Sequence, residues 1–194
     1  WQQIRQPGSN CNYFIVSSDT CPFTNLNILQ HAVVDGDVAL MEEVVALGAA
    51  LDFPVPDENA PDVPPSPAPP GSTALLLACA FLAMYSEMGR RSRTPVPAEN
   101  LEFLDRNCEC AIRLVHLGAN CQVKLQIPTQ RGNAPVNPKD HVTIFRALDL
   151  GGKTAQELAI MSGQQEVIRV IEVMQKGENI HLTQCRCGSR LPWN

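Results

Sequence analysis

The chain has 194 residues and a formal net charge of −5 at pH 7, a size that suits one core and is short for two. Its acidic balance argues against the basic surface that nucleic-acid binding requires, so no nucleic-acid partner is expected. The sequence contains no run of about 18 apolar residues, so we expect no membrane partner and no membrane-spanning helix.

The first 24 residues lack a helical period and are interpreted as an N-terminal capping segment, residues 1–24. Within it, residues 13–16 suit either a short strand or a segment that packs over the open end of the first helical unit. Helical periodicity begins at Asn27, which can form a capping box with Gln30 because the two lie three residues apart. Gly36 then suits the tight turn to a second helix.

Apolar residues recur at helical spacing in the second helix of three units, at about 25–53, 71–125 and 150–176. The stripes consist of Leu40, Met41, Val44, Val45 and Leu47 in the first unit, Ala111, Ile112, Leu114, Val115 and Leu117 in the second, and Val167, Ile168, Val170, Ile171 and Met174 in the third. We expect these stripes to face a shared core.

Irregular stretches interrupt the units. Residues 54–70 are rich in proline and predict an extended, polyproline-like finger. Residues 86–100 are interpreted as a loop between the two helices of the second unit. This loop carries the sequence Arg-Arg-Ser-Arg-Thr-Pro from Arg90, which suits either a phosphorylation site or acidic-partner patch, or a solvated loop. A third irregular stretch covers residues 126–140.

The third unit repeats the signals of the first. Thr154 and Glu157 form a second capping-box pattern, and Gly163 again suits the turn between paired helices. Thr154-Ala155-Gln156-Glu157-Leu158-Ala159 also parallels the Thr-Ala-x-x-x-Ala sequence that starts at Thr73. These repeated patterns predict helix–turn–helix units that share one core.

Taken together, Thr-Ala-x-x-Leu-Ala, glycine in the interhelical turn, a Val/Leu-rich second helix and a following Gly-Ala resemble the ankyrin repeat. The resemblance covers about residues 25–176 and three divergent repeats. It implies an all-α array of helix–turn–helix units with long irregular fingers. It also implies a non-catalytic scaffold that binds another protein on a concave surface of fingers and first helices. By that resemblance, the candidate partner contacts are Phe53, Asn120, Gln122, Lys124, Arg146 and Asp149.

The C-terminal tail, residues 177–194, contains Cys185-Arg186-Cys187-Gly188-Ser189. This stretch resembles the opening of the SecA C-terminal-type (SEC-C) zinc motif. The resemblance implies that Cys185 and Cys187 supply two of four zinc ligands, with the second pair beyond Asn194. We therefore expect no cofactor in this chain and zinc in a longer parent protein. The alternative function is a zinc-binding module in which this Cys-x-Cys motif is the functional element.

The eight cysteines favour a reduced chain. Cys79 lies within an apolar segment, and Cys108 and Cys110 belong to a helical pattern, where cysteines act as small buried hydrophobes. A disulfide between Cys11 and Cys21 is the pairing most able to contradict this interpretation. Together with the tail and the proline-rich finger, these features suggest a eukaryotic intracellular protein, cytoplasmic or nuclear.

Catalysis is not expected, because no nucleophile has a base within reach. Cys108 and His116 lie about 12 Å apart on one helix, and Cys110 and His116 fall on different faces. The sequence from Gly151 to Thr154 lacks the spacing of a phosphate-binding loop. We therefore predict that the protein is not an enzyme.

Overall fold

Helices form nearly all the regular structure of the described part of the chain. The computed structural model describes residues 14–15, 26–56, 68–92, 98–127 and 141–177. The elements are β1 (Phe14–Ile15), β2 (Leu26–Asn27), α1 (Ile28–Asp35), α2 (Val38–Ala46), α3 (Ala74–Ser92), α4 (Ala98–His116), α5 (His141–Ala147), α6 (Ala155–Ser162) and α7 (Gln165–Gln175). The prediction of an all-α fold is therefore confirmed.

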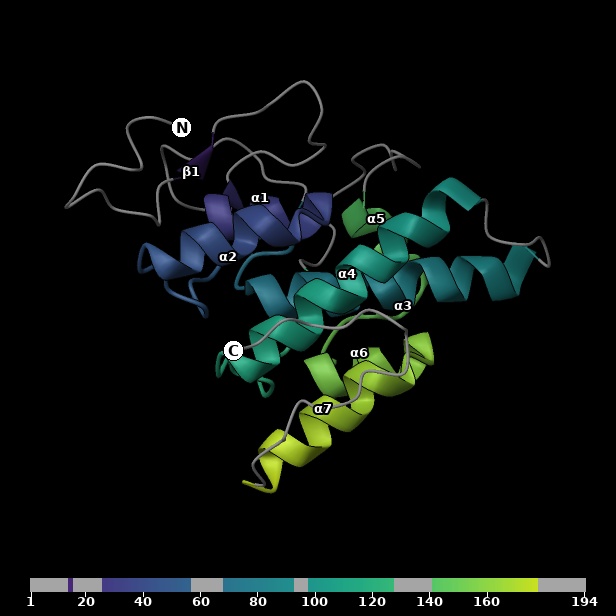
Figure 1. The fold of residues 1–194 in the computed structure, drawn as a ribbon. Coiled ribbons are helices and arrows are strands. Elements are labelled where there is room, and N and C mark those ends of the chain that lie inside the picture. Colours follow the sequence, from purple (N-terminus) through teal and green to yellow (C-terminus); the bar gives the residue numbers. More distant parts are fainter. Residues whose placement is uncertain (1–13, 16–25, 57–67, 93–97, 128–140, 178–194) are drawn as a thin grey trace.

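Three helical hairpins stack in chain order, as Figure 1 shows from α1–α2, through α3–α4, to α6–α7. We call them hairpins one, two and three. The first helices form one row, α1 against α3 and α3 against α6, and the second helices form another, α2 against α4 and α4 against α7. One continuous apolar core joins all three hairpins. Hairpin two therefore has a neighbour on both sides, whereas hairpins one and three each lie at an end of the stack.

The first helices begin at polar caps, as the sequence predicts. Asn27 and Thr154 each accept a backbone N–H, and Gln30 and Glu157 bond back to the backbone of the cap residue. In hairpin two, the Thr73 hydroxyl accepts the N–H of Leu76 at 3.3 Å. These caps satisfy donors that a helix start leaves without partners.

Glycine ends the first helix of hairpins one and three. Gly36 and Gly163 have φ angles of 68° and 75°, in the left-handed region where a Cβ is strained. Both predicted turns are therefore confirmed.

The predicted loop at residues 86–100 is wrong, because α3 continues to Ser92 and α4 begins at Ala98. Ring contacts support these longer helices: Phe103 lies 5.6 Å from Tyr85 and 6.4 Å from Phe81 between centroids. Such edge-to-face pairs stabilise the packing of α3 against α4. The insertion in the second unit therefore lengthens its helices.

The proline-rich stretch at residues 54–70 is anchored at both ends. Val55 and Ala68 are buried, and Val55 exchanges backbone hydrogen bonds with Gly71 and Ser72. The two ends of the predicted finger are therefore held against the array. Residues 57–67 lie outside the described residues.

Three members of the predicted apolar stripes are exposed instead of buried. Leu47 and Leu117 follow the last residues of α2 and α4, so they leave the helical period that would direct them to the core. Met174 lies in the last turn of α7 and is also exposed. The apolar stripe of each second helix therefore ends at the last turn of that helix.

Of the two alternatives for residues 13–16, the structure shows a short strand at Phe14–Ile15. This strand pairs antiparallel with Leu26–Asn27, immediately before α1. The rest of the predicted capping segment, residues 1–13 and 16–24, lies outside the described residues.

Candidate partner-binding surface

The segment after α2, residues 49–55, is a short finger that we call finger one. The chain turns at Gly48, with φ at 93°, and the buried Ala49 donates its N–H to the carbonyl of Val44 at 3.2 Å. At the far end, Val55 is buried and donates to the carbonyl of Ser72 at 2.9 Å. Finger one is therefore fixed at its base and tied to the start of hairpin two.

Finger two, residues 119–125, repeats this construction after α4. Gly118 has φ at 92°, and Ala119 donates to the carbonyl of Leu114 at 3.0 Å. Leu125 is fully buried and exchanges bonds with its neighbours: its N–H donates to Lys153 at 2.8 Å, and its carbonyl accepts from Gly152 at 2.7 Å. Each finger is thus pinned to the hairpin that follows it.

A direct hydrogen bond joins the two fingers. The backbone N–H of Asn120 donates to Oδ1 of Asp52 at 2.8 Å, and the side chain of Asn120 accepts the N–H of Gln122 at 2.9 Å. The first bond fixes the relative positions of the two fingers, and the second fixes the backbone within finger two. The exposed side chains Asp52, Asn120, Gln122 and Lys124 lie on this joined base, and we call them the finger surface.

A buried glutamine of α1 binds the backbone of finger one. Gln30 is fully buried, and its Nε2 donates to the carbonyls of Phe53 at 2.7 Å and Ser72 at 3.3 Å. Its Oε1 accepts the N–H of Asn27 at 3.0 Å. One side chain therefore connects α1, finger one and hairpin two.

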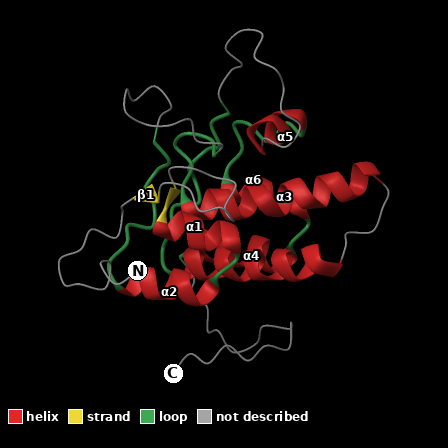
Figure 2. Cartoon of the chain, turned by 90° about the horizontal axis from the view of Figure 1, so that it is seen from above, coloured by secondary structure: helices red, strands yellow, loops and turns green. Residues whose placement is uncertain are grey.

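Helix α5 extends this side of the molecule, because in Figure 2 the green loops rise from the helices toward the side on which α5 lies. Phe145 anchors α5 in the core, 5.8 Å from the ring of Phe81. Arg146 is half-buried, while Asp149 is exposed and has a φ of 56°, unusual for a residue with a Cβ. The sequence did not predict α5, because seven residues are too few to show a period.

The structure brings four of the six candidate contacts together. Asn120, Gln122 and Lys124 belong to finger two, and Phe53 belongs to finger one, which is bonded to it. Arg146 lies in the last turn of α5, and Asp149 lies in the turn that follows this helix.

Sequence reasoning missed Asp52, which joins the fingers. The matching Gly-Ala pairs at residues 48–49 and 118–119 provide the signal that could have found it. They align finger one with finger two, so that Asp52 occupies the sequence position equivalent to Gln122.

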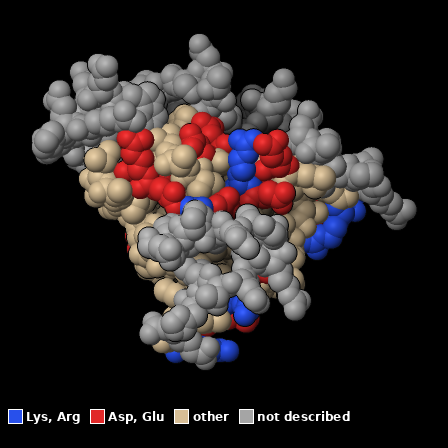
Figure 3. Space-filling view, viewed as in Figure 1, with Lys and Arg blue, Asp and Glu red and all other residues tan. Residues whose placement is uncertain are grey.

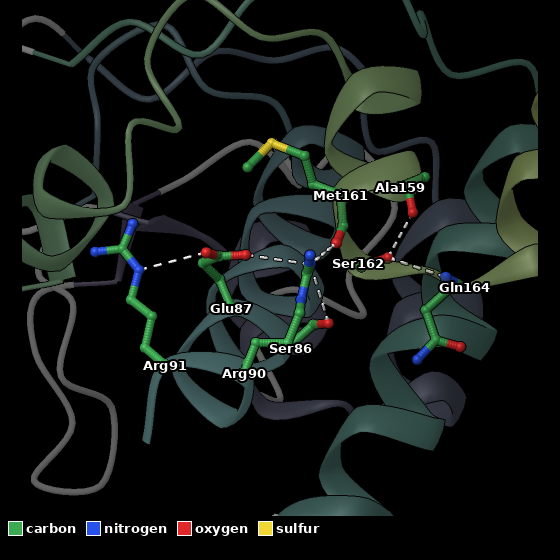
Figure 4. A network of polar contacts seen from close by, with 8 residues as sticks. All are labelled: Ser86, Glu87, Arg90, Arg91, Ala159, Met161, Ser162 and Gln164. Carbon is green, nitrogen blue, oxygen red and sulfur yellow. Dashed lines mark hydrogen bonds and ion pairs between the residues drawn. The ribbon is translucent and has the colours of Figure 1, made fainter. Parts of the chain in front are cut away.

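Two arginines of the predicted loop bind neighbouring helix ends, and Figure 4 shows the contact of Arg90 with Met161 and the pairing of both arginines with Glu87. Arg90 donates to the carbonyl of Met161 near the end of α6, and Arg91 donates to the carbonyl of Ala147, the last residue of α5, at 3.2 Å. Glu87 pairs with both guanidinium groups, at 3.2 and 3.3 Å. Cations at helix C-termini satisfy carbonyls and oppose the helix dipole. These arginines therefore join hairpin two to α5 and to hairpin three.

Acidic side chains gather over the second helices, as Figure 3 shows on the face over α2 and α4. Arg113 lies within this face and pairs with Glu42 of α2 and Glu109 of its own helix. A surface of this sign repels a phosphate backbone.

The described cysteines of α3 and α4 occupy apolar surroundings. Cys79 and Cys110 are fully buried, as the sequence predicts, and burial raises the pKa of both thiols, that of Cys110 to about 12. Burial also lowers the pKa of His116. A buried thiol of this kind remains protonated near neutral pH and is a poor nucleophile.

The described residues contain no group of three or more His, Cys, Asp or Glu side chains arranged to hold a metal ion. The predicted zinc ligands Cys185 and Cys187 lie outside the described residues. Among the described helices, none is both long and apolar enough to cross a bilayer. Comparison of the chain with protein-family models, curated proteins and solved structures finds no match.

Proposed function

We propose that this chain is a non-catalytic intracellular scaffold, similar to an ankyrin-repeat protein, that holds a protein partner on its finger surface. The observation that carries the proposal is the hydrogen bond between the fingers, from Asn120 to Asp52. Backbone bonds of Val55 and Leu125 hold each finger to the hairpin that follows it. A surface whose backbone is already fixed loses little conformational entropy when it binds.

The side chains of the finger surface suit a protein partner. Asp52, Asn120, Gln122 and Lys124 offer both charges and amide groups, which can form hydrogen bonds with a polypeptide. The half-buried Phe53 lies beside them in the chain and offers an aromatic anchor. The acidic face over α2 and α4 supports a protein partner over a nucleic acid.

The experiment begins with the whole chain as bait, chemical cross-linking and identification of the partner by mass spectrometry. The dissociation constant of that partner is then measured by calorimetry for two matched variants, Gln122→Arg on finger two and Gln165→Arg on α7. Both glutamines are exposed, so both changes add the same bulk and charge at a surface. We expect Gln122→Arg to weaken binding by about tenfold or more and Gln165→Arg to leave it unchanged.

Equal effects of the two variants, or a larger effect of Gln165→Arg, would show that the finger surface is not the binding site. A parallel measurement with a metal chelator separates the scaffold from the zinc-module alternative. Binding that persists in chelator supports the array as the functional element, and binding that disappears supports the alternative.

A further inference from the structure

The end of α3 carries a group of long side chains that the core does not use. Residues three and four apart on a helix are neighbours, which places five side chains next to one another around α3, in the order Ser86, Arg90, Glu87, Arg91 and Met88. We call these five residues the arginine corner. The side chains of Arg90 and Arg91 are 57% and 55% exposed, and Met88 is 44% exposed. The corner therefore presents two cations and one apolar side chain to solvent.

Both guanidinium groups of the corner are held in place by neighbouring groups. Nη2 of Arg90 donates to the carbonyl of Met161, and Nη1 of Arg91 donates to the carbonyl of Ala147 at 3.2 Å. The carboxylate of Glu87 lies between them and pairs with Nη2 of Arg90 at 3.2 Å and with Nε of Arg91 at 3.3 Å (Figure 4). The directions of both groups are therefore fixed before a partner binds.

Each guanidinium keeps donors for a further acceptor. Arginine has five N–H groups in a planar fork. Within the part of the chain that the structure describes, Nε and Nη1 of Arg90 and Nη2 of Arg91 make no hydrogen bond. More than half of each side chain is exposed, so these donors are accessible from solvent. A fork of this kind matches the two oxygens of a carboxylate.

The charge of the corner is opposite to that of the whole chain. Arg146 lies in the last turn of α5, the helix whose last residue accepts the bond from Arg91, and adds a third guanidinium beside the corner. Glu87 and Asp149 offset only part of these charges. Figure 3 shows Lys and Arg side chains at the edge of the molecule where α3 ends, whereas acidic side chains gather over α2 and α4. In a chain of net charge −5, the corner is therefore a local attractor for anionic groups.

We propose that the arginine corner binds an acidic segment of a partner protein, whose carboxylates accept hydrogen bonds from Arg90 and Arg91. Met88 is the helical neighbour of Arg91 and offers a flexible apolar contact beside the charges. A short acidic segment fits this corner better than a long polyanion, because a long polyanion would also meet the acidic side chains over α2 and α4. This site is separate from the finger surface and does not depend on the function proposed there.

Fluorescence anisotropy of a labelled oligoglutamate peptide, titrated with the whole chain at about 50 mM salt, tests the site. We expect Arg91→Gln to weaken binding by about fivefold, and the double change Arg90→Gln with Arg91→Gln to weaken it by about tenfold or more. The matched control is Arg169→Gln, because it removes the same charge from an exposed position on α7. The control is expected to leave binding unchanged.

A gain of binding separates the site from an effect on folding. Glu87→Gln removes the carboxylate that competes for both guanidinium groups, so we expect the peptide to bind about threefold more tightly, which a misfolded variant would not show. No binding by the unchanged chain, weaker binding by Glu87→Gln, or equal effects of Arg91→Gln and Arg169→Gln would overturn the proposal.

Two further measurements identify other occupants of the corner. Inorganic phosphate that displaces the peptide at concentrations where free glutamate does not would assign the corner to a phosphate group and overturn the proposal. A concentration-dependent dimer in light scattering that Arg91→Gln dissociates would also overturn it, because the acidic face of a second copy would then occupy the corner.

Discussion

Hairpins one and three begin with the same local signals and have different surroundings. Asn27 and Thr154 cap α1 and α6 in the same way, with capping boxes completed by Gln30 and Glu157. Gln30 is fully buried because hairpin two lies against it, whereas Glu157 is exposed. Since the local signals match, the difference comes from the neighbour. Helix formation in this fold is therefore local, while stability depends on how the hairpins stack.

The largest effect is expected when this pair of cap partners is truncated. Gln30→Ala removes the acceptor of the Asn27 N–H and the amide that donates to the carbonyls of Phe53 and Ser72, of which the Ser72 carbonyl keeps its bond from Val55. We expect a loss of about 3 kcal/mol in the free energy of unfolding. Glu157→Ala removes the same cap interaction at an exposed site and is expected to lose less than about 1 kcal/mol.

Urea unfolding followed by circular dichroism measures both variants. Equal losses would show that the buried bonds of Gln30 to finger one add nothing to the cap itself. The comparison between the buried cap partner of hairpin one and the exposed cap partner of hairpin three would then fail at its central contact.

The turn glycines provide the next comparison. Alanine at Gly36 or Gly163 forces a left-handed φ on a residue with a Cβ, which costs about 1 kcal/mol. At Gly36 the added Cβ would also lie 3.0 Å from Cβ of Arg106 and 3.4 Å from Nδ2 of Asn107, whereas at Gly163 nothing lies within 4 Å. We therefore expect Gly36→Ala to lose about 2 kcal/mol and Gly163→Ala about 1 kcal/mol.

Thermal and urea unfolding of the two alanine variants give the difference directly. A larger loss at Gly163 than at Gly36 would mean that the turn of hairpin one does not lie tightly on α4.

These contrasts explain which features the sequence could predict. The caps at Asn27 and Thr154 and the turn glycines depend on residues close in the chain, so their patterns were sufficient. The length of α3 and α4 depends on contacts between distant residues, such as Tyr85 with Phe103. A run of arginines before a proline therefore looked like a loop.

The features of the candidate surface also differ in whether residues close in the chain determine them. The exposure of Gln122 and Lys124 follows from their place in a finger, which the repeat pattern locates. The bond from Asn120 to Asp52 joins two fingers that are far apart in the sequence, so the pattern within either finger does not reveal it and only the alignment of the two Gly-Ala pairs points to Asp52.

A smaller effect is expected at the contact between hairpins two and three. Arg90→Met removes the donor to the carbonyl of Met161 near the end of α6. Because the Arg90 side chain is 57% exposed, we expect a loss of only about 0.5 kcal/mol in urea unfolding. Arg169→Met is the control, since Arg169 is exposed on α7. A greater loss for the control would show that Arg90 does not connect the hairpins.

The smallest effect is a difference in the pH dependence of the two end hairpins. Burial raises the pKa of Asp35 in α1, an effect that the nearby His31 opposes and Asp37 strengthens. The backbone N–H and hydroxyl of Thr154 lower the pKa of Glu157 in α6, with help from Lys153 and Lys124. Glu157 therefore contributes stability above its unfolded pKa that is lost as pH falls, whereas the contribution of Asp35 increases as pH falls.

Urea midpoints between about pH 6 and pH 3 separate these two contributions. Glu157→Gln is expected to flatten the loss of stability on acidification, because it removes a group that binds protons more tightly in the unfolded chain. Asp35→Asn is expected to steepen that loss, because it removes a group that binds protons more tightly in the folded chain. Slopes that change in the same direction for both variants would show that the two carboxylates experience similar environments. The different surroundings of hairpins one and three would then have no effect on the titration of their carboxylates.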